Sequence, residues 1–227
     1  MTGITEHLNR LNCRISKALA NSGRGPDDAQ LLAVSKRHDM AAILDAAANG
    51  LTDFGENYVS EAVEKIKTAP PELNWHFIGR IQSNKTREIA THFDWVQTVD
   101  RAKIARRLNE QRPDDAEALQ VLIQVQTDPE DQHGGVSPGE LAGLAQLIDE
   151  LPRLQLRGLM CIPAPSTNIE QQQKPFRLMK ELFSQLQSDG HDIDTLSMGM
   201  SNDLEAAIIE GSTMVRIGTD LFGPRPT

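Results

Sequence analysis

The sequence is poor in the residues that build disulfide frameworks, metal centres and membrane spans. Its 227 residues include only two cysteines, Cys13 and Cys161, which lack CxxC spacing, and its six histidines are not clustered. Neither a disulfide framework nor a metal site is therefore indicated. No apolar run has the length of a membrane-spanning helix, and the N-terminal stretch lacks a signal-peptide core. We expect a cytoplasmic protein in which Cys161 is buried.

Basic residues are also scarce relative to acidic ones. The chain has 23 Lys and Arg against 32 Asp and Glu, a formal net charge of −9. Such a charge repels nucleic acid and anionic membranes at long range, so we expect neither as a partner. A local basic site for a small anion is still compatible with this balance. The apolar content of 39% is ample for an ordinary buried core.

Short β-like runs alternate with helical stretches along the chain, after an N-terminal helix. The eight strand candidates are 31–36 (LLAVSK), 52–57 (TDFGEN), 74–79 (NWHFIG), 95–99 (WVQTV), 119–126 (LQVLIQVQ), 154–162 (LQLRGLMCI), 195–198 (TLSM) and 214–218 (MVRIG). This alternation predicts parallel βαβ units. We favour a single (β/α)8 barrel of the TIM type with an extra N-terminal helix, although an open doubly wound sheet gives similar patterns.

No linker or change of composition divides the chain, so we expect one domain over residues 1–227. The longest loop-like segment, 127–140, follows the fifth strand. Barrel enzymes place their sites on that face, at the carboxyl ends of the strands.

Two glycine-containing turns follow the last two strands, at Gly199–Ser201 and Gly218–Thr219. In such barrels the loops after strands seven and eight often hold a phosphate. Each turn is expected to present backbone N–H groups at the start of a helix, where an anion is favoured. Either glycine alone would be read as easing a turn, but their pairing favours a phosphate site.

Lys36 ends the first strand, and the alternation of side chains places it on the same side as Leu32 and Val34. If that side faces the barrel axis, partial desolvation lowers the pKa of the amine, which can then form an imine with an aldehyde. The simpler alternative is a lysine that extends from a strand end to water. Together with the phosphate turns, Lys36 makes pyridoxal 5′-phosphate (PLP) the leading ligand hypothesis.

Arg216 shares a strand face with Met214 and Gly218. A guanidinium inside a barrel needs either a buried carboxylate or a ligand. If the ligand is a pyridine ring, a permanent cation beside the ring nitrogen disfavours its protonation and weakens the electron sink used in carbanion chemistry.

Three further positions have weaker signals. Asn57 is a candidate for a polar contact to a ligand ring, and His76 for a neutral donor or acceptor near the barrel mouth. The simpler interpretations are a helix cap for Asn57 and a core histidine for His76. In the segment 82–85 (QSNK), Ser83 is a candidate helix cap.

Over nearly its whole length the chain resembles the pyridoxal phosphate homeostasis proteins, a family related to the barrel domain of alanine racemase. The segments that carry the resemblance are, in order, LLAVSK, FGENYV, WHFIGRIQSNK, RGLMCIPAP and SMGMSNDLEAAIIEGSTMVRIGTDLFG. Members are understood to bind PLP and to influence vitamin B6 and amino-acid homeostasis, without established turnover. The resemblance implies a single-domain PLP carrier in the cytoplasm, with apo PLP-dependent enzymes as acceptors; we expect a monomer.

The resemblance also implies roles for six residues of this sequence. Lys36 would form the Schiff base and Arg216 would face the pyridine nitrogen. The phosphate would be bound by Ser201, Gly218 and Thr219, and Asn57 would lie beside the ring. The chain departs from the family after the fifth strand, where His133-Gly134-Gly135 stands in place of a Lys-Ser-Gly-like run and Gln126 in place of a common Asn.

Two enzymatic alternatives remain. A PLP-dependent amino-acid racemase needs an acid/base group on the face of the substrate opposite Lys36, and the candidates are Tyr58, the only tyrosine, and two histidines, His38 and His76. A sugar-phosphate aldolase also uses an imine-forming lysine, and Glu56 is its nearest acid/base candidate. We expect a carrier without turnover, with the racemase as the second hypothesis.

Overall fold

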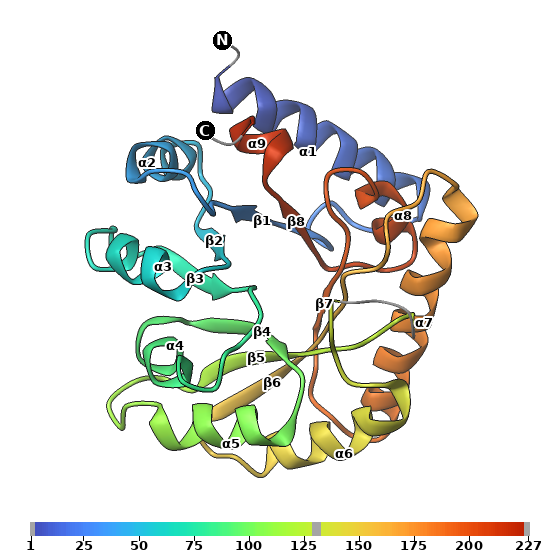
Figure 1. Cartoon of the computed structure of the whole chain (residues 1–227). Helices are drawn as coiled ribbons and strands as arrows, with labels where there is room; N and C mark the ends of the chain where they lie inside the picture. The colour runs from blue at the N-terminus through green and yellow to red at the C-terminus, as the bar shows by residue number, and fades with distance from the viewer. Residues whose placement is uncertain (1–2, 129–132, 225–227) are drawn as a thin grey trace.

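The computed structural model describes residues 3–128 and 133–224, and its eight parallel strands close into a barrel in which β8 pairs with β1 (Figure 1). The expected barrel is confirmed, and the open sheet is excluded by this closure. The strands are β1 (Gln30–Val34), β2 (Asp53–Glu56), β3 (Asn74–Phe77), β4 (Trp95–Val99), β5 (Leu119–Gln124), β6 (Leu154–Met160), β7 (Thr195–Ser197) and β8 (Met214–Ile217).

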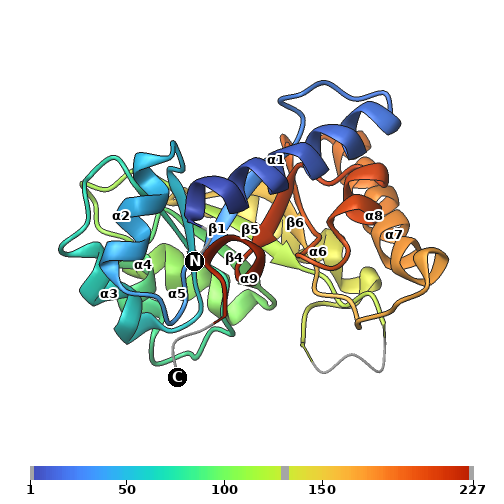
Figure 2. The ribbon, with the colours of Figure 1, turned by 90° about the horizontal axis from the view of Figure 1, so that it is seen from above.

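Helices surround the barrel. They are α1 (Ile4–Asn21), α2 (Met40–Ala48), α3 (Val59–Ile66), α4 (Thr86–His92), α5 (Ala102–Gln111), α6 (Pro138–Asp149), α7 (Ile169–Ser188), α8 (Leu204–Ile209) and α9 (Thr219–Phe222). The expected extra helix is α1, which lies beside α8 and α9 (Figures 1 and 2). It buries Leu8, Leu11, Ile15 and Leu19, whose spacing of three and four residues gives a helix one apolar face.

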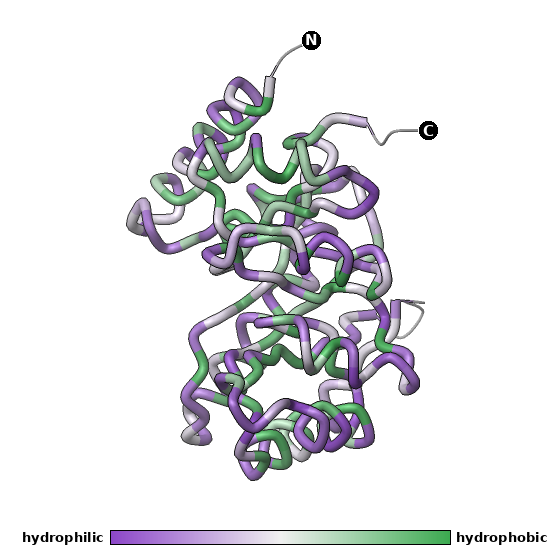
Figure 3. Tube along the Cα trace, turned by 90° about the vertical axis from the view of Figure 1, so that its left-hand side faces the viewer, coloured by the Kyte–Doolittle hydropathy of each residue, from purple (hydrophilic) through white to green (hydrophobic). Residues whose placement is uncertain are grey.

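The apolar core has two layers. The larger one fills the space between the sheet and the helices and includes Phe54, Trp75 and Phe77. The smaller one, inside the barrel, consists of Leu32, Val34, Ile78 and Met214. Apolar and polar stretches accordingly alternate along the described part of the Cα trace (Figure 3). The inner cluster identifies which strand residues point toward the barrel axis.

The structure corrects several local expectations. Ser83 does not cap a helix: α4 begins at Thr86, whose hydroxyl donates to the Ser83 carbonyl at 3.0 Å. Asn57 is not the cap of α3 either, because Tyr58 occupies that position. Cys161 is fully buried, as expected.

The described residues contain neither a helix suited to a membrane nor a cluster suited to a metal ion. None of their helices combines the length and the apolar character needed to cross a bilayer. Nor do those residues gather three or more His, Cys, Asp or Glu side chains in a metal-binding arrangement.

Candidate functional site

Lys36 and Arg216 come from neighbouring strands at the point where the barrel closes. In the β1–β8 pair, Leu32 lies opposite Arg216. Leu32, Val34 and Met214 all belong to the inner cluster, so alternation points Arg216 toward the barrel axis. Lys36 follows Val34 by two residues in the turn after β1 and is half-buried. The shared face of Leu32 and Val34 on β1 is therefore observed, and so is that of Met214 and Arg216 on β8, whereas Lys36 lies in the turn beyond β1.

Ser35, the residue before Lys36, is held by hydrogen bonds on the outer side of the barrel. The Ser35 hydroxyl donates to Oε1 of Glu56 at 2.6 Å. Nζ of Lys65, on α3, donates to that same carboxylate oxygen at 2.7 Å and to the Ser35 carbonyl at 3.0 Å. Glu56 is fully buried; burial raises the pKa of its carboxyl, while the hydrogen bonds from Lys65 and Ser35 oppose that rise. The Ser35 side chain is therefore held on the side of α3, immediately before the turn that carries Lys36.

The residues after Lys36 are held as well. Arg37 adopts a left-handed backbone with φ of 63°, and its N–H donates to Oε1 of Glu61 at 2.6 Å. The ring of His38 stacks on Phe222 of α9 with the ring centroids 4.8 Å apart. The turn that carries Lys36 is thus attached both to α3 and to the last helix of the chain.

Arg216 is buried, with 4% of its surface exposed. Its guanidinium donates to the Ser197 carbonyl at 2.8 Å, to the Ser197 hydroxyl at 2.9 Å and to the Cys161 carbonyl at 2.8 Å. Burial lowers the pKa of Arg216, but an arginine starts so high that the guanidinium remains charged at neutral pH. These bonds come from both terminal nitrogens of the guanidinium, which has five N–H groups in all.

The turn after β7 is longer than expected. Gly199 has φ of 95°, and a Cβ there would lie 2.5 Å from Cβ of Ala207, so the position requires glycine. The N–H of Met200 donates to Oδ1 of Asp203 at 2.6 Å, and α8 begins only at Leu204. The Met200 amide is therefore already engaged, and Ser201 lies in the turn instead of at the helix start.

The turn after β8 matches the expectation more closely. Gly218 immediately precedes α9, and its carbonyl accepts from the N–H groups of Leu221 and Phe222. The N–H groups of Gly218 and Thr219 come earlier, so they have no acceptor within the helix. They lie next to β1, with the Val34 carbonyl 3.4 Å from the place where a Cβ of Gly218 would be.

Arg14 of α1 joins these two turns, a contact that the sequence did not predict. Its guanidinium makes a two-point hydrogen bond to Glu205, at 2.6 and 2.8 Å, and reaches the Ser201 carbonyl at 2.8 Å. It also donates to Asp220 of α9 at 2.8 Å. A single arginine on a polar helix face gives no sequence signal of such a role, because charged residues on that face are usually solvated.

Asn57 lies just after β2 and is half-buried. Its Oδ1 atom is buried and has no hydrogen-bond partner among the described residues. The residue lines a cavity of about 180 Å³, together with Tyr58, Arg80, Lys85 and other residues of the β2–α3 and β3–α4 connections. An unpaired buried acceptor of this kind is suited to a polar ligand group.

His76 is not near the mouth, as the sequence had suggested, but fully buried inside the barrel. Its Nε2 lies 3.0 Å from Oδ1 of Asp53 and its Nδ1 lies 3.0 Å from Nε2 of Gln97. Burial lowers the pKa of His76 more than Asp53 raises it, so the ring is neutral. The alternative interpretation, a satisfied core histidine, is confirmed.

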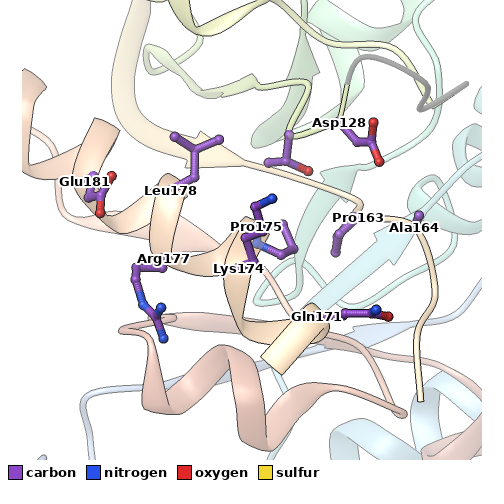
Figure 4. Close-up of a pocket in the computed structure, with 10 residues that line it drawn as sticks. Asp128, Pro163, Ala164, Gln171, Lys174, Pro175, Arg177, Leu178 and Glu181 are labelled. Carbon is purple, nitrogen blue, oxygen red and sulfur yellow. The ribbon is translucent and has the colours of Figure 1, made fainter. Parts of the chain in front are cut away.

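A larger cavity of about 490 Å³ lies between α7 and the loops after β5 and β6 (Figure 4). Its lining includes side chains of both signs of charge. Lys174, Arg177 and Glu181 come from α7, and Asp128 comes from the loop after β5. None of the six residues predicted for the site lines this cavity. Part of the long loop after the fifth strand, residues 129–132, lies outside the described residues.

The sequence is similar to those of known proteins over nearly its whole length. Residues 7–226 match the family described as alanine racemase, N-terminal domain. The pyridoxal phosphate homeostasis protein of Haemophilus influenzae is 52% identical, over 98% of this chain and 96% of that one. The chain belongs to the family of pyridoxal phosphate homeostasis proteins.

Solved structures agree with this membership. The PipY protein of Synechococcus elongatus, solved with PLP bound, is 38% identical, with a TM-score of 0.78 over 92% of this chain and all of that one. An alanine racemase of Clostridium difficile is 17% identical, with a TM-score of 0.76 over 96% of this chain and 57% of the racemase. The second likeness concerns the fold alone.

Proposed function

We propose that this protein binds PLP at the mouth of the barrel and holds it on Lys36. The observation that carries the proposal is the convergence of Lys36 and Arg216 from the neighbouring strands β1 and β8, beside the turn at Gly218. An amine, a buried cation and a turn whose N–H groups have no acceptor within α9 match the aldehyde, the ring nitrogen and the phosphate of PLP. The names of the Haemophilus influenzae and Synechococcus elongatus proteins support the same ligand.

The other residues predicted for the site carry polar groups that suit the phosphate and the ring of PLP. The N–H groups of Gly218 and Thr219 and the Ser201 hydroxyl would hold the phosphate, and the unpaired Oδ1 of Asn57 would lie by the ring. When bound, PLP supplies an aldehyde that condenses with a lysine amine to a Schiff base with loss of water. Arg216, charged and unable to accept a proton, would keep the ring nitrogen unprotonated.

We propose a carrier, with apo PLP-dependent enzymes in the cytoplasm as acceptors, in preference to a racemase. Racemisation needs a second acid/base group opposite the lysine. His76 does not supply one, because both of its ring nitrogens are hydrogen-bonded inside the barrel. Tyr58 is 48% exposed, and the guanidinium of Arg37 lies over its ring at 5.9 Å. The cation at Arg216 further disfavours carbanion chemistry.

The test is spectroscopic. The purified protein is mixed with PLP, its visible absorption is recorded, and borohydride is added. We expect a band that disappears on reduction, with the cofactor mass attached to Lys36. Lys36→Ala should abolish the band, whereas Lys85→Ala, which removes a half-exposed lysine beside Asn57, should retain it. A band that survives in Lys36→Ala would contradict the role of this lysine.

The racemase alternative is tested with the same preparation. The loaded protein is incubated with L-alanine in deuterated water, and exchange at Cα is followed by proton NMR. The carrier proposal predicts no exchange above the rate of free PLP. Inversion or exchange at enzymatic rates would replace the carrier by a racemase.

A further inference from the structure

A line of hydrogen bonds crosses the interior of the barrel from Arg216 to its opposite end. Arg216 donates to Oγ of Ser197 at 2.9 Å, and the Ser197 hydroxyl donates to Oε1 of Gln97 at 2.7 Å. Nε2 of Gln97 lies 3.0 Å from Nδ1 of His76, and Nε2 of His76 lies 3.0 Å from Oδ1 of Asp53. We call these five residues the interior network; they come from β8, β7, β4, β3 and β2 (Figure 1).

Donors and acceptors fix the direction of every bond. A guanidinium can only donate, so Oγ of Ser197 accepts from Arg216 and its own proton goes to Gln97. The Gln97 amide nitrogen then donates to Nδ1 of His76, which leaves the ring proton on Nε2, facing Asp53. The interior network therefore runs one way, from a cation to a carboxylate.

The opposite arrangement of the Gln97 amide does not fit a neutral His76. With the amide reversed, Oε1 would face Nδ1, which must then carry a proton, while Nε2 still needs one for Asp53. Only a doubly protonated ring meets both demands. The observed orientation also lets the second Gln97 N–H reach Sδ of Met214 at 3.2 Å, and the His76 ring is held by stacking on Trp95 with centroids 5.1 Å apart.

Arg216 needs such support because it is buried and its hydrogen bonds among the described residues go to carbonyl and hydroxyl oxygens, not to a carboxylate. A buried cation without a partner is costly, and carbonyl and hydroxyl acceptors must replace the lost water. The carboxylate whose charge acts directly on Arg216 is that of Asp203, in the turn after β7, and Asp53 adds a second negative charge at the far end of the interior network. The Asp53 carboxyl is destabilised by burial, but hydrogen bonds led by the one from His76 bring its pKa below the usual value, so it stays ionised.

We propose that Ser197, Gln97 and His76 are positioning residues that orient Arg216 toward the cofactor ring through this one-way network, anchored by Asp53. The inference rests on the proposed function, since it assumes that Arg216 faces the ring nitrogen of PLP. It adds that residues on the far side of the barrel, which do not touch the ligand, determine how the Arg216 guanidinium faces the ring. Aligned hydrogen bonds of this kind strengthen one another in a low-dielectric interior.

The first experiment needs no cofactor. Nitrogen-15 NMR of the protein without PLP should show His76 with a proton on Nε2 and none on Nδ1, assigned by the loss of the signals in His76→Asn. In Gln97→Glu the carboxylate accepts at both ends, so the ring should carry protons on both nitrogens at neutral pH. A wild-type ring protonated on Nδ1, or a Gln97→Glu ring unchanged from wild type, would overturn the network.

The second experiment measures PLP binding. Ser197→Ala removes one of the three acceptors of Arg216, and we expect the dissociation constant of PLP to rise about tenfold, ~1.4 kcal/mol. The visible band of the bound cofactor should also shift. The matched control is Ser212→Ala, since Ser212 is as fully buried as Ser197 but its hydroxyl donates to backbone carbonyls of β7 and β8 and their turns. The control should change the dissociation constant less than about twofold.

The outcomes separate the two proposals. If the wild-type protein takes up no PLP, the proposed function fails, while the ring-nitrogen measurement still decides whether the interior network exists. If PLP binds and Ser197→Ala behaves as Ser212→Ala does, the network does not position Arg216. Should Ser197→Ala fail to fold, the Gln97→Glu spectrum and its PLP affinity take its place, and an affinity equal to that of wild type overturns the positioning role.

Discussion

Replacing Lys65 by methionine should destabilise the barrel by about 3–5 kcal/mol at neutral pH, the usual cost of breaking a buried ion pair from one side. Lys65 has only 10% of its side chain exposed and donates to Glu56, Glu61 and the Ser35 carbonyl. Methionine keeps the length of the side chain but removes all three bonds. Glu56, fully buried, would keep only the hydroxyl of Ser35, because its second oxygen has no partner among the described residues.

The loss should depend on pH in a defined direction. Burial already raises the pKa of Glu56 in the folded protein, and removing Lys65 raises it further. A carboxyl whose pKa is higher in the folded than in the unfolded protein stabilises the folded state when it is protonated. That stabilisation is complete below the unfolded-state pKa and is lost as the pH rises through the folded-state pKa. The difference in stability between Lys65→Met and wild type should therefore shrink as the pH falls.

The assay is urea unfolding followed by circular dichroism and by tryptophan fluorescence, whose transitions must coincide for a single free energy to be defined. The double variant Lys65→Met with Glu56→Gln should recover most of the loss, since the uncompensated charge is gone while Ser35 keeps an acceptor. A loss below about 1 kcal/mol at neutral pH, or one that grows on acidification, would refute the reasoning.

Two further predictions concern the turns after β7 and β8. Arg14→Ala should weaken PLP binding and lower the melting temperature at neutral pH. The hydrogen bond from Arg14 lowers the pKa of Glu205, so its stabilisation is present above the usual carboxyl pKa and is lost as the pH falls through the lowered pKa. The melting curves of the variant and the wild type should therefore converge in acid. Gly199→Ala should destabilise the protein by about 1–3 kcal/mol in urea unfolding, given φ of 95° and the contact with Ala207. Gly139→Ala, in open space on α6, should instead stabilise it by up to ~1 kcal/mol, and equal effects of the two substitutions would contradict the argument.

The sequence predicted the faces of the strands better than the contacts of their side chains. Alternation is a property of the extended backbone, so the sequence alone places Leu32 with Val34 and Met214 with Arg216 on shared faces. Only the structure shows that these faces point into the barrel. The resemblance to a known family added roles for Lys36 and Asn57, which remain predictions. Fold and family are confirmed by the barrel closure and by the relatives.

What the sequence missed depends on long-range packing. His76 was a candidate donor or acceptor near the barrel mouth, yet its partners Asp53 and Gln97 lie on the flanking strands and satisfy its ring inside the barrel. Arg14 precedes its partner Glu205 by 191 residues. Ser83 looked like a helix cap, but helix starts vary by a few residues in such predictions.

The closure of the barrel by β1 and β8 has a consequence for how the protein is made. The residues proposed for the two ends of the cofactor, Lys36 and Arg216, are separated by most of the chain and become neighbours only through the pairing of the first and last strands. The proposed site is therefore incomplete in a nascent chain until β8 has left the ribosome. Any ligand bound there stabilises the whole closed barrel and none of its fragments.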